Sequence, residues 1–149
     1  MIYFEDIQPG TKAAFGHYAV TRDEVIDFAR KYDPQAFHLS DEAAAQTHFG
    51  RLSASGWHTC AMMMAMLVEN MKTTEQAGLG SPGQDELRWL KPVYPGDTLR
   101  IETEILDKRA SNSRPEMGSY RSKITVLNQH DEAVMTTIAI GLIRTRPSD

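Results

Sequence analysis

Residues 55–70, SGWHTCAMMMAMLVEN, decide the fold. They are mostly strong helix formers, and almost no polar side chain interrupts them for about two and a half turns, which predicts a helix. A helix that is apolar on every side must be covered on every side. We therefore expect a long central helix enclosed by the rest of the chain, with its four methionines as adaptable core side chains.

The sequence that follows this helix has the pattern of strands. Apolar and polar residues alternate over 99–105 and 120–126, as they do in strands with one wet face. The stretch 134–143 is apolar on both phases, which predicts a central strand, and 85–93 is a further strand candidate. YPGD at 94–97 places proline and glycine where a type II turn needs them.

The sequence that precedes the helix is largely helical in pattern. TRDE at 21–24 is a capping box, in which the threonine caps a helix and the glutamate reaches back to it. Pro34 ends that helix, and a second, shorter helix is expected over 40–48. With an N-terminal strand around 13–21, the chain predicts a sheet wrapped around one helix, of class α+β.

Composition narrows the functional classes. The 149 residues, 41% of them hydrophobic, suit a single domain spanning 1–149. A formal charge of −4 disfavours nucleic acid as a partner, and one cysteine excludes an intramolecular disulfide framework. The longest apolar run, 60–68, is far shorter than the roughly 20 residues of a membrane span. We expect a reduced, cytoplasmic protein that binds neither nucleic acid nor membrane.

Two groups of residues could carry chemistry. Asp33 and His38 lie between two helical stretches, where both side chains can reach one point, although an Asx turn beside a surface histidine would give the same pattern. Ser55 and Gly56 begin the central helix, where they are ordinary capping residues. The free amide groups and dipole at that position would also suit a developing oxyanion.

Three stretches together carry a family resemblance: YDPQAFH at 32–38, FGRLSASGWHT at 49–59 and LRWLKPVYPGD at 87–97. With these stretches in this order, the chain resembles the MaoC-like dehydratases, relatives of the (R)-specific enoyl-CoA hydratases, over nearly its whole length. The resemblance implies the hotdog fold, an antiparallel sheet wrapped around a long central helix. It also implies a homodimer or a larger homo-oligomer, in which a second copy completes the substrate tunnel.

The resemblance also implies a reaction and roles for the site residues. Such enzymes are hydro-lyases that interconvert (R)-3-hydroxyacyl-CoA and trans-2-enoyl-CoA, with the CoA thioester as substrate and no metal or other cofactor. Asp33 and His38 would be the catalytic pair acting on one water, and the backbone N–H of Gly56 would receive the thioester oxygen. The chain departs from many members by having Ser55 where they have histidine, and Met64 where some have serine.

Two alternative functions stay open. Hotdog acyl-CoA thioesterases commonly take a carboxylate from the central helix, whereas this helix has none before Glu69. A non-catalytic acyl-thioester binding protein would keep the pocket and lose the chemistry. For the CoA phosphates, the candidate cations are Arg51, Arg88 and Lys91. His58 either lines the pocket or packs as an ordinary histidine.

Overall fold

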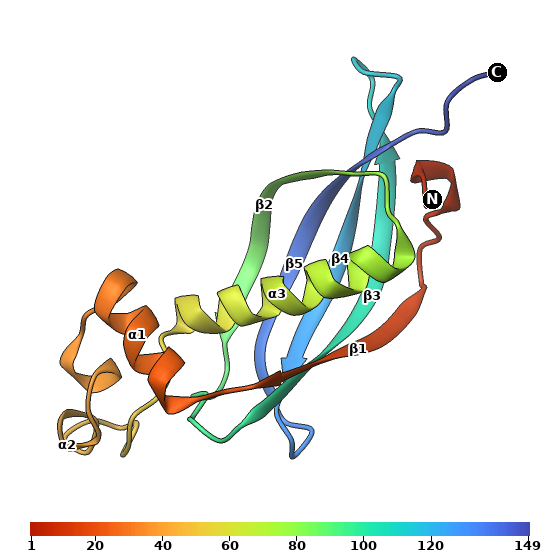
Figure 1. The fold of residues 1–149 in the computed structure, drawn as a ribbon. Coiled ribbons are helices and arrows are strands. Elements are labelled where there is room, and N and C mark those ends of the chain that lie inside the picture. The colour runs from red at the N-terminus through yellow and green to blue at the C-terminus, as the bar shows by residue number, and fades with distance from the viewer.

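The computed structural model describes residues 1–149 as one antiparallel sheet with a long helix lying across it (Figure 1). The five strands are hydrogen-bonded in the order β1-β3-β4-β5-β2, so β1 and β2 form the two edges. The strands are β1 Lys12–Ala19, β2 Gly78–Trp89, β3 Thr98–Ala110, β4 Met117–Leu127 and β5 Ala133–Arg144. The helices are α1 Arg22–Tyr32, α2 Asp41–Ala44 and α3 Gly56–Thr74.

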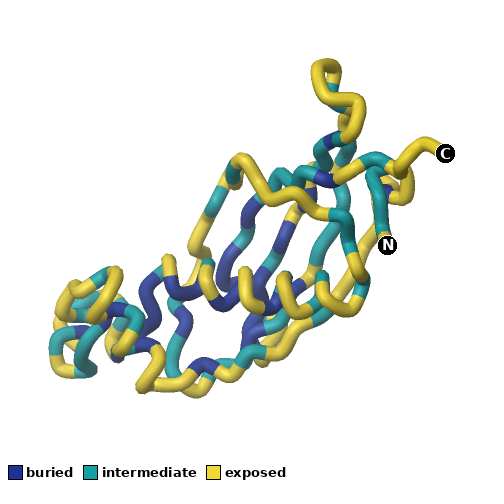
Figure 2. Tube along the Cα trace, turned by 45° about the horizontal axis from the view of Figure 1, so that its top comes forward, coloured by how far each residue is buried: buried dark blue, intermediate teal, exposed yellow.

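The core lies between α3 and the sheet, as the sequence predicts. Figure 2 shows that the buried positions lie along the middle of the strands and in the N-terminal part of α3. Three of the four methionines in 55–70 are buried there. They pack with branched side chains of the sheet, and together they form a cluster that includes Met62, Met63, Met66, Leu99, Ile101, Ile124, Val126, Val134 and Met135.

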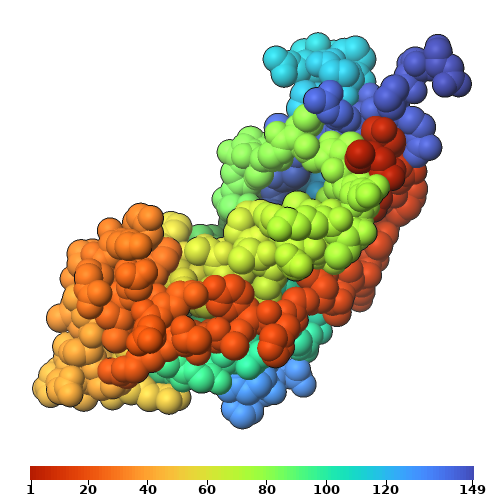
Figure 3. Space-filling view, in the orientation of Figure 1, coloured from red at the N-terminus to blue at the C-terminus, as the bar shows by residue number.

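The expectation that α3 is covered on every side is wrong for this chain alone. Figure 3 shows α3, coloured yellow to green, lying at the surface of the molecule. Trp57, Met64 and Val68 are 59%, 45% and 39% exposed. The reason is that the sheet contacts α3 from one side only, so Met64 and Val68 on the opposite side stay exposed, and Trp57 contacts only the edge of Trp89.

The strand predictions are mostly confirmed. β5 lies between β4 and β2, so the doubly apolar stretch is an interior strand. The strand candidate at 85–93 is misplaced, because β2 begins at Gly78 and ends at Trp89. Glycine, serine and proline in 78–83 disfavour a strand, and the ladder with β5 overrides them with several register shifts. Gly96 has φ +95°, as a type II turn requires.

The helical predictions before α3 need two corrections. The expected helix over 40–48 is only the single turn α2, because the Thr47 hydroxyl bonds the Ala44 carbonyl and accepts the Phe49 N–H, which turns the chain. At α1, Thr21 caps the helix by accepting the Glu24 N–H, as predicted. The Glu24 carboxylate does not reach back, however, and is instead engaged by two residues outside the helix.

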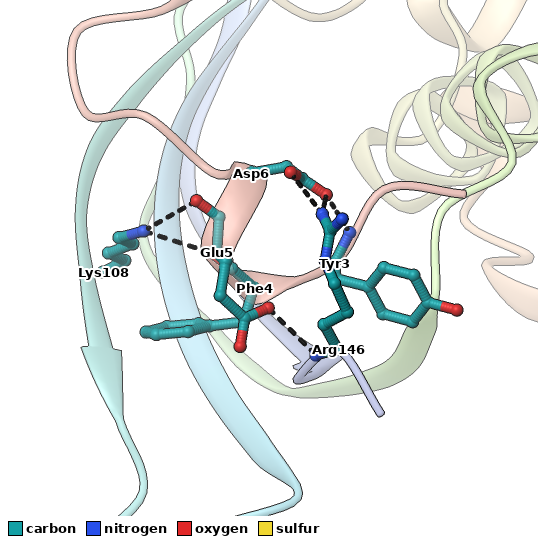
Figure 4. Close-up of polar contacts among 6 residues, drawn as sticks. All are labelled: Tyr3, Phe4, Glu5, Asp6, Lys108 and Arg146. Carbon is teal, nitrogen blue, oxygen red and sulfur yellow. Dashed lines mark hydrogen bonds and ion pairs between the residues drawn. The ribbon is translucent and has the colours of Figure 1, made fainter. Parts of the chain in front are cut away.

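The N-terminal and C-terminal segments of the chain are joined by an ion pair and hydrogen bonds, which together are called the clasp below (Figure 4). Arg146 donates to both carboxylate oxygens of Asp6 at 2.6 and 2.7 Å, and its backbone N–H donates to Glu5. Lys108 on β3 donates to the Phe4 carbonyl at 3.1 Å. This clasp lies at the end of the sheet away from α1 and α2 (Figure 1), so it leaves the region of the candidate site free. No helix combines the length and apolar character that crossing a membrane requires.

Candidate active site

Three helix boundaries bring the candidate residues together. Asp33 is the C-cap of α1, where Pro34 stops the helix and the Asp33 N–H still bonds the Ala29 carbonyl. His38 ends a short 3-10 turn that follows immediately. Ser55 is the N-cap of α3. The structure therefore places one helix end, one turn and one helix start at the same point.

Asp33 and His38 face one another. The His38 Nε2 lies 3.6 Å from the Asp33 Oδ2, and the two side chains are only 6% and 16% exposed. This separation is too long for a direct hydrogen bond, so each atom can still form a hydrogen bond with another molecule. Both groups remain able to hold one small polar molecule between them.

The backbone fixes which His38 nitrogen is the base. Nδ1 lies 2.8 Å from the Ser53 carbonyl, which can only accept a hydrogen bond. In the neutral ring Nδ1 therefore carries the proton, and the lone pair of Nε2 faces Asp33. The rings of Phe37 and Phe49 pack against the imidazole at centroid distances of 4.6 and 5.8 Å. The ring is thus held in the orientation that a general base needs.

The Asp33 carboxylate is held as an anion. Burial raises its pKa, but hydrogen bonds from the Ser55 hydroxyl and the Gln35 amide, together with the nearby His38, lower the pKa more, and the net result is below the ordinary value. Ser55 donates to Oδ2 at 2.7 Å and Gln35 donates to Oδ1 at 2.7 Å. Asp33 is therefore charged at neutral pH and presents its oxygens to His38.

The Ser55 hydroxyl bonds groups of the protein on both sides. The sequence predicts a substrate-binding residue here, whereas the structure directs its fully buried hydroxyl to Asp33. The same oxygen accepts the Trp57 N–H at 3.3 Å. Ser55 thus links the start of α3 to the end of α1, and its hydroxyl is already used within the protein.

Gly56 leaves its N–H free. No acceptor in the chain receives it, and it stands in the first turn of a 19-residue helix, where the dipole favours negative charge. The Trp89 indole lies over this residue, so that a Cβ at position 56 would come within 2.5 Å of the ring. Trp89 also donates from Nε1 to the Gly56 carbonyl at 2.9 Å. Glycine is required here because the indole occupies the space of a side chain.

Sequence reasoning missed three contributors to this site: Gln35, Ser53 and Trp89. Gln35 and Ser53 lie inside the stretches that carry the family resemblance, but nothing in their spacing says that one bonds Asp33 through its side chain and the other bonds His38 through its backbone. Trp89 comes from β2, far from Gly56 in the sequence. Only its place in the third of those stretches, 87–97, marks it as a candidate.

The three candidate cations differ in how free they are. Lys91 forms an ion pair with Glu132. Arg51 stacks its guanidinium 3.9 Å from the centre of the Tyr94 ring, and Arg88 donates only to its neighbour's carbonyl. Arg51 and Arg88 therefore remain available to an anion.

No group of three or more His, Cys, Asp or Glu side chains is placed to hold a metal ion.

Comparison with known proteins identifies the family. Residues 6–126 match a family model described as the MaoC like domain. The chain belongs to the MaoC-like dehydratase family. A solved MaoC-like dehydratase from Rhodospirillum rubrum superposes on this one with a TM-score of 0.89 and 36% identity, covering 99% of this chain and 100% of that one. This likeness confirms the hotdog fold of the MaoC-like chain.

Two characterised relatives are more distant. The 3-hydroxybutyryl-CoA dehydratase of Methylorubrum extorquens is 28% identical over 109 residues, which cover 72% of this MaoC-like chain and 66% of that protein. The mesaconyl-CoA hydratase of Cereibacter sphaeroides is 41% identical over 64 residues, which cover 43% of this chain and 18% of that protein. The family therefore indicates a dehydratase or hydratase and leaves the substrate open.

Proposed function

We propose that this MaoC-like dehydratase adds water to trans-2-enoyl-CoA and removes it from (R)-3-hydroxyacyl-CoA. The observation that carries the proposal is the pairing of Asp33 and His38, 3.6 Å apart, beside a helix start with a free Gly56 N–H. A base, an acid and an oxyanion donor are the groups that this reaction needs. The two relatives named as acting on CoA thioesters support the same substrate class.

The proposed reaction balances with these groups alone. In hydration, a water bound between Asp33 and His38 gives one proton to His38 Nε2 while its oxygen forms the new bond to C3. The electron pair of the C2–C3 double bond moves toward the thioester, and negative charge develops on the carbonyl oxygen. The proton then passes from the pair to C2. No electron is gained or lost, so the proposal includes no redox cofactor.

Gly56 would stabilise the developing charge. Its N–H points from the positive end of α3, and a fixed backbone donor needs no reorganisation when charge appears. The Trp89 indole packs against the same residue and donates to its carbonyl, which helps to fix the position of Gly56. In dehydration the same donor would stabilise the enolate that forms when the proton leaves C2.

We propose that Arg51 and Arg88 meet the phosphates of the CoA carrier. Both guanidinium groups lack a carboxylate partner, and both lie in the stretches that flank the site. Lys91 is the weakest of the three candidate cations because Glu132 already neutralises it. Two local cations suffice for a phosphate-bearing substrate even though the whole chain is acidic.

We propose that a second copy of this chain covers the open side of α3. The exposed residues Trp57, Met64 and Val68 form an apolar stripe on the helix. Strand β2 pairs only with β5, so its other side is free to pair with a second β2. A homodimer would cover both features at once.

As a further proposal, the single cysteine suits a reducing compartment such as the cytoplasm.

Three assays on one purified sample separate the candidate functions. The chain is incubated with enoyl-CoAs of increasing length and branching. Loss of the conjugated enoyl absorbance reports hydration, thiol release reports thioester hydrolysis, and calorimetry reports binding. We expect hydration with an (R)-3-hydroxyacyl product and no thiol release. Thiol release without hydration would indicate a thioesterase, and binding without turnover of any enoyl-CoA would indicate a binding protein; either result would overturn the proposal.

A further inference from the structure

A second polar cluster joins α1 to α3 away from the catalytic pair. His58 is 3% exposed, and its Nε2 lies 3.2 Å from the Glu24 Oε1 on α1. The Tyr18 hydroxyl, from β1, donates to the same Glu24 oxygen. The His58 ring also stacks on Phe28, one turn further along α1, with centroids 4.7 Å apart and planes within 8°. One carboxylate therefore joins three elements of the fold.

The protonation states in this cluster are defined by its surroundings. Burial lowers the pKa of His58, although the hydrogen bond and charge of Glu24 oppose this effect, so the ring is neutral near pH 7. Its Nε2–H then donates to Glu24. The hydrogen bond to Glu24, with burial and the nearby charge, raises the pKa of Tyr18 to about 12, so Tyr18 also remains a donor. The His58 Nδ1 is buried and has no partner.

The cluster provides one of the direct links between α1 and α3. An open pocket of about 210 Å³ lies beside this cluster, bordered by Phe28, Tyr32, Ala61 and Met62. Elsewhere the two helices share apolar packing, because the buried Val25 of α1 belongs to the same core cluster as Met62 of α3. Direct polar links remain at two points, Glu24 with His58 and Asp33 with Ser55. The buried His58 Nδ1 without a partner lowers the stability of the fold, and the bond from Nε2 to Glu24 offsets part of this loss.

Two helical segments, one in α1 and one in α3, connect the cluster to the candidate active site. From Glu24, α1 runs to its C-cap Asp33, and from His58, α3 runs back two residues to Gly56. A change in the Glu24 to His58 link would therefore tilt one helix against the other. Such a tilt would move the Asp33 carboxylate relative to the Gly56 N–H.

We propose that Tyr18, Glu24 and His58 are positioning residues that fix the spacing between the Asp33 carboxylate and the Gly56 N–H. The inference rests on the proposed function, since it assigns these residues to the same reaction. None of the three contacts the catalytic pair. They act through the relative position of α1 and α3, to which a reacting geometry is sensitive.

Four variants test the proposal by steady-state kinetics of hydration. His58→Phe keeps the ring on Phe28 and loses the N–H, and Glu24→Leu removes the acceptor. We expect each to lower kcat by about tenfold or more with KM little changed. Glu24→Gln keeps an acceptor oxygen and should restore kcat to within about threefold of wild type. Combining His58→Phe with Glu24→Leu should lower kcat no further than Glu24→Leu alone, because Glu24→Leu already removes the link to His58 together with the one to Tyr18.

The control is Asp27→Asn, on the same helix and beside the same pocket, which removes only an exposed ion pair with Lys31. It should leave kcat unchanged. All rates are measured where denaturation curves show each variant fully folded. Additive losses in the double variant, equal losses for Glu24→Gln and Glu24→Leu, or unchanged kcat in both His58→Phe and Glu24→Leu would overturn the proposal.

Failure of the proposed function would give a different result. If wild type hydrates no enoyl-CoA, the kinetic arm is lost, and crystal structures of wild type and His58→Phe decide the matter. The proposal then requires that α1 shifts against α3 and that the Ser55 to Asp33 hydrogen bond, 2.7 Å here, lengthens or breaks. An unmoved α1 in His58→Phe would contradict it.

Discussion

The Ser55 hydroxyl donates to the Asp33 Oδ2 at 2.7 Å, and this is the same oxygen that lies 3.6 Å from His38 Nε2. The N-cap of one helix therefore bonds the C-cap of another, directly at the candidate catalytic pair. This bond lowers the pKa of Asp33 and fixes one of its oxygens. The start of α3, which also provides the free Gly56 N–H, is thereby coupled to the acidity of the carboxylate.

Replacing Ser55 with alanine should therefore shift the pH dependence of the reaction. The variant loses a hydrogen bond that favours the charged form of Asp33, so the pKa of Asp33 rises. Asp33 is then protonated at a higher pH, and the step of the acid limb of the kcat/KM profile that reports Asp33 moves toward neutral pH. Loss of the N-cap should also lower the free energy of unfolding by about 1 kcal/mol.

The matched control for this prediction is Ser40→Ala. Ser40 caps α2 by accepting the Ala43 N–H and does not touch Asp33. It should lower stability without moving the acid limb. An acid limb that stays in place in Ser55→Ala, or that moves equally in both variants, would argue against the assigned role of Ser55. The profiles are measured with one enoyl-CoA from about pH 3 to about pH 8, a range that starts below the ordinary pKa of a carboxylate and ends above that of an imidazole.

Gly56→Ala should damage both stability and activity. The new methyl group would come within 2.5 Å of the Trp89 ring, and relieving this clash requires the indole or the helix start to move. Overpacking of this kind costs about 1–3 kcal/mol, measurable by urea denaturation, and the moved N–H should lower kcat. Adding Trp89→Ala should recover part of the lost stability.

Gly83→Ala serves as the control for Gly56→Ala. Gly83 lies on β2 and does not adopt a positive φ, and a methyl group added there would meet no atom within 4 Å. Its replacement should be close to neutral. If Gly56→Ala is equally neutral, the close approach of Trp89 does not explain the glycine.

Arg88→Ala should weaken binding of the CoA carrier. A guanidinium without a carboxylate partner is free to bind phosphate, and losing one such charged contact raises KM by about tenfold. With an N-acetylcysteamine thioester, which lacks the phosphates, KM should not change. Lys91→Ala provides the comparison, because Glu132 already occupies that lysine. Equal effects of Arg88→Ala on both substrates would show that Arg88 does not meet phosphate.

Met64→Glu should separate the two copies of the proposed homodimer. Met64 lies 45% exposed in the apolar stripe of α3, where a carboxylate would be buried without a partner if a second chain covered it. Light scattering should give a dimer for wild type and a shift toward monomer for the variant. Glu69→Gln, on an exposed position of the same helix, should remain dimeric. A monomeric wild type would contradict the proposed assembly.

Local sequence signals predicted the parts of the fold that local physics decides. The start of α3, the end of α1 before Pro34 and the turn at Gly96 all follow from capping, proline and glycine rules. The first half of β2 could not be predicted, because its composition disfavours a strand and only the pairing with β5 forms it. An open flank beside a second copy was expected, but the sequence does not say which residues of α3 form it, because apolar residues occur on every side of this helix.

In the candidate active site, too, the local features could be predicted from the sequence and the tertiary contacts could not. Asp33 and His38 are near each other in the sequence, so their meeting could be anticipated from a short loop. The residues that set the charge of Asp33 and the orientation of His38 could not be predicted from the sequence. Ser55 reaches Asp33 across 22 positions. Glu24 satisfies its capping spacing yet bonds Tyr18 and His58, because tertiary partners replace the local one.

The most direct test of the account is the hydration rate of Asp33→Asn and His38→Gln beside wild type, measured on an enoyl-CoA whose binding is followed separately by calorimetry. Both replacements keep size and polarity while removing the charge or the base. Each replacement should lower kcat by about a hundredfold or more while the enoyl-CoA still binds. Variants that hydrate as fast as wild type would show that Asp33 and His38 do not carry the reaction.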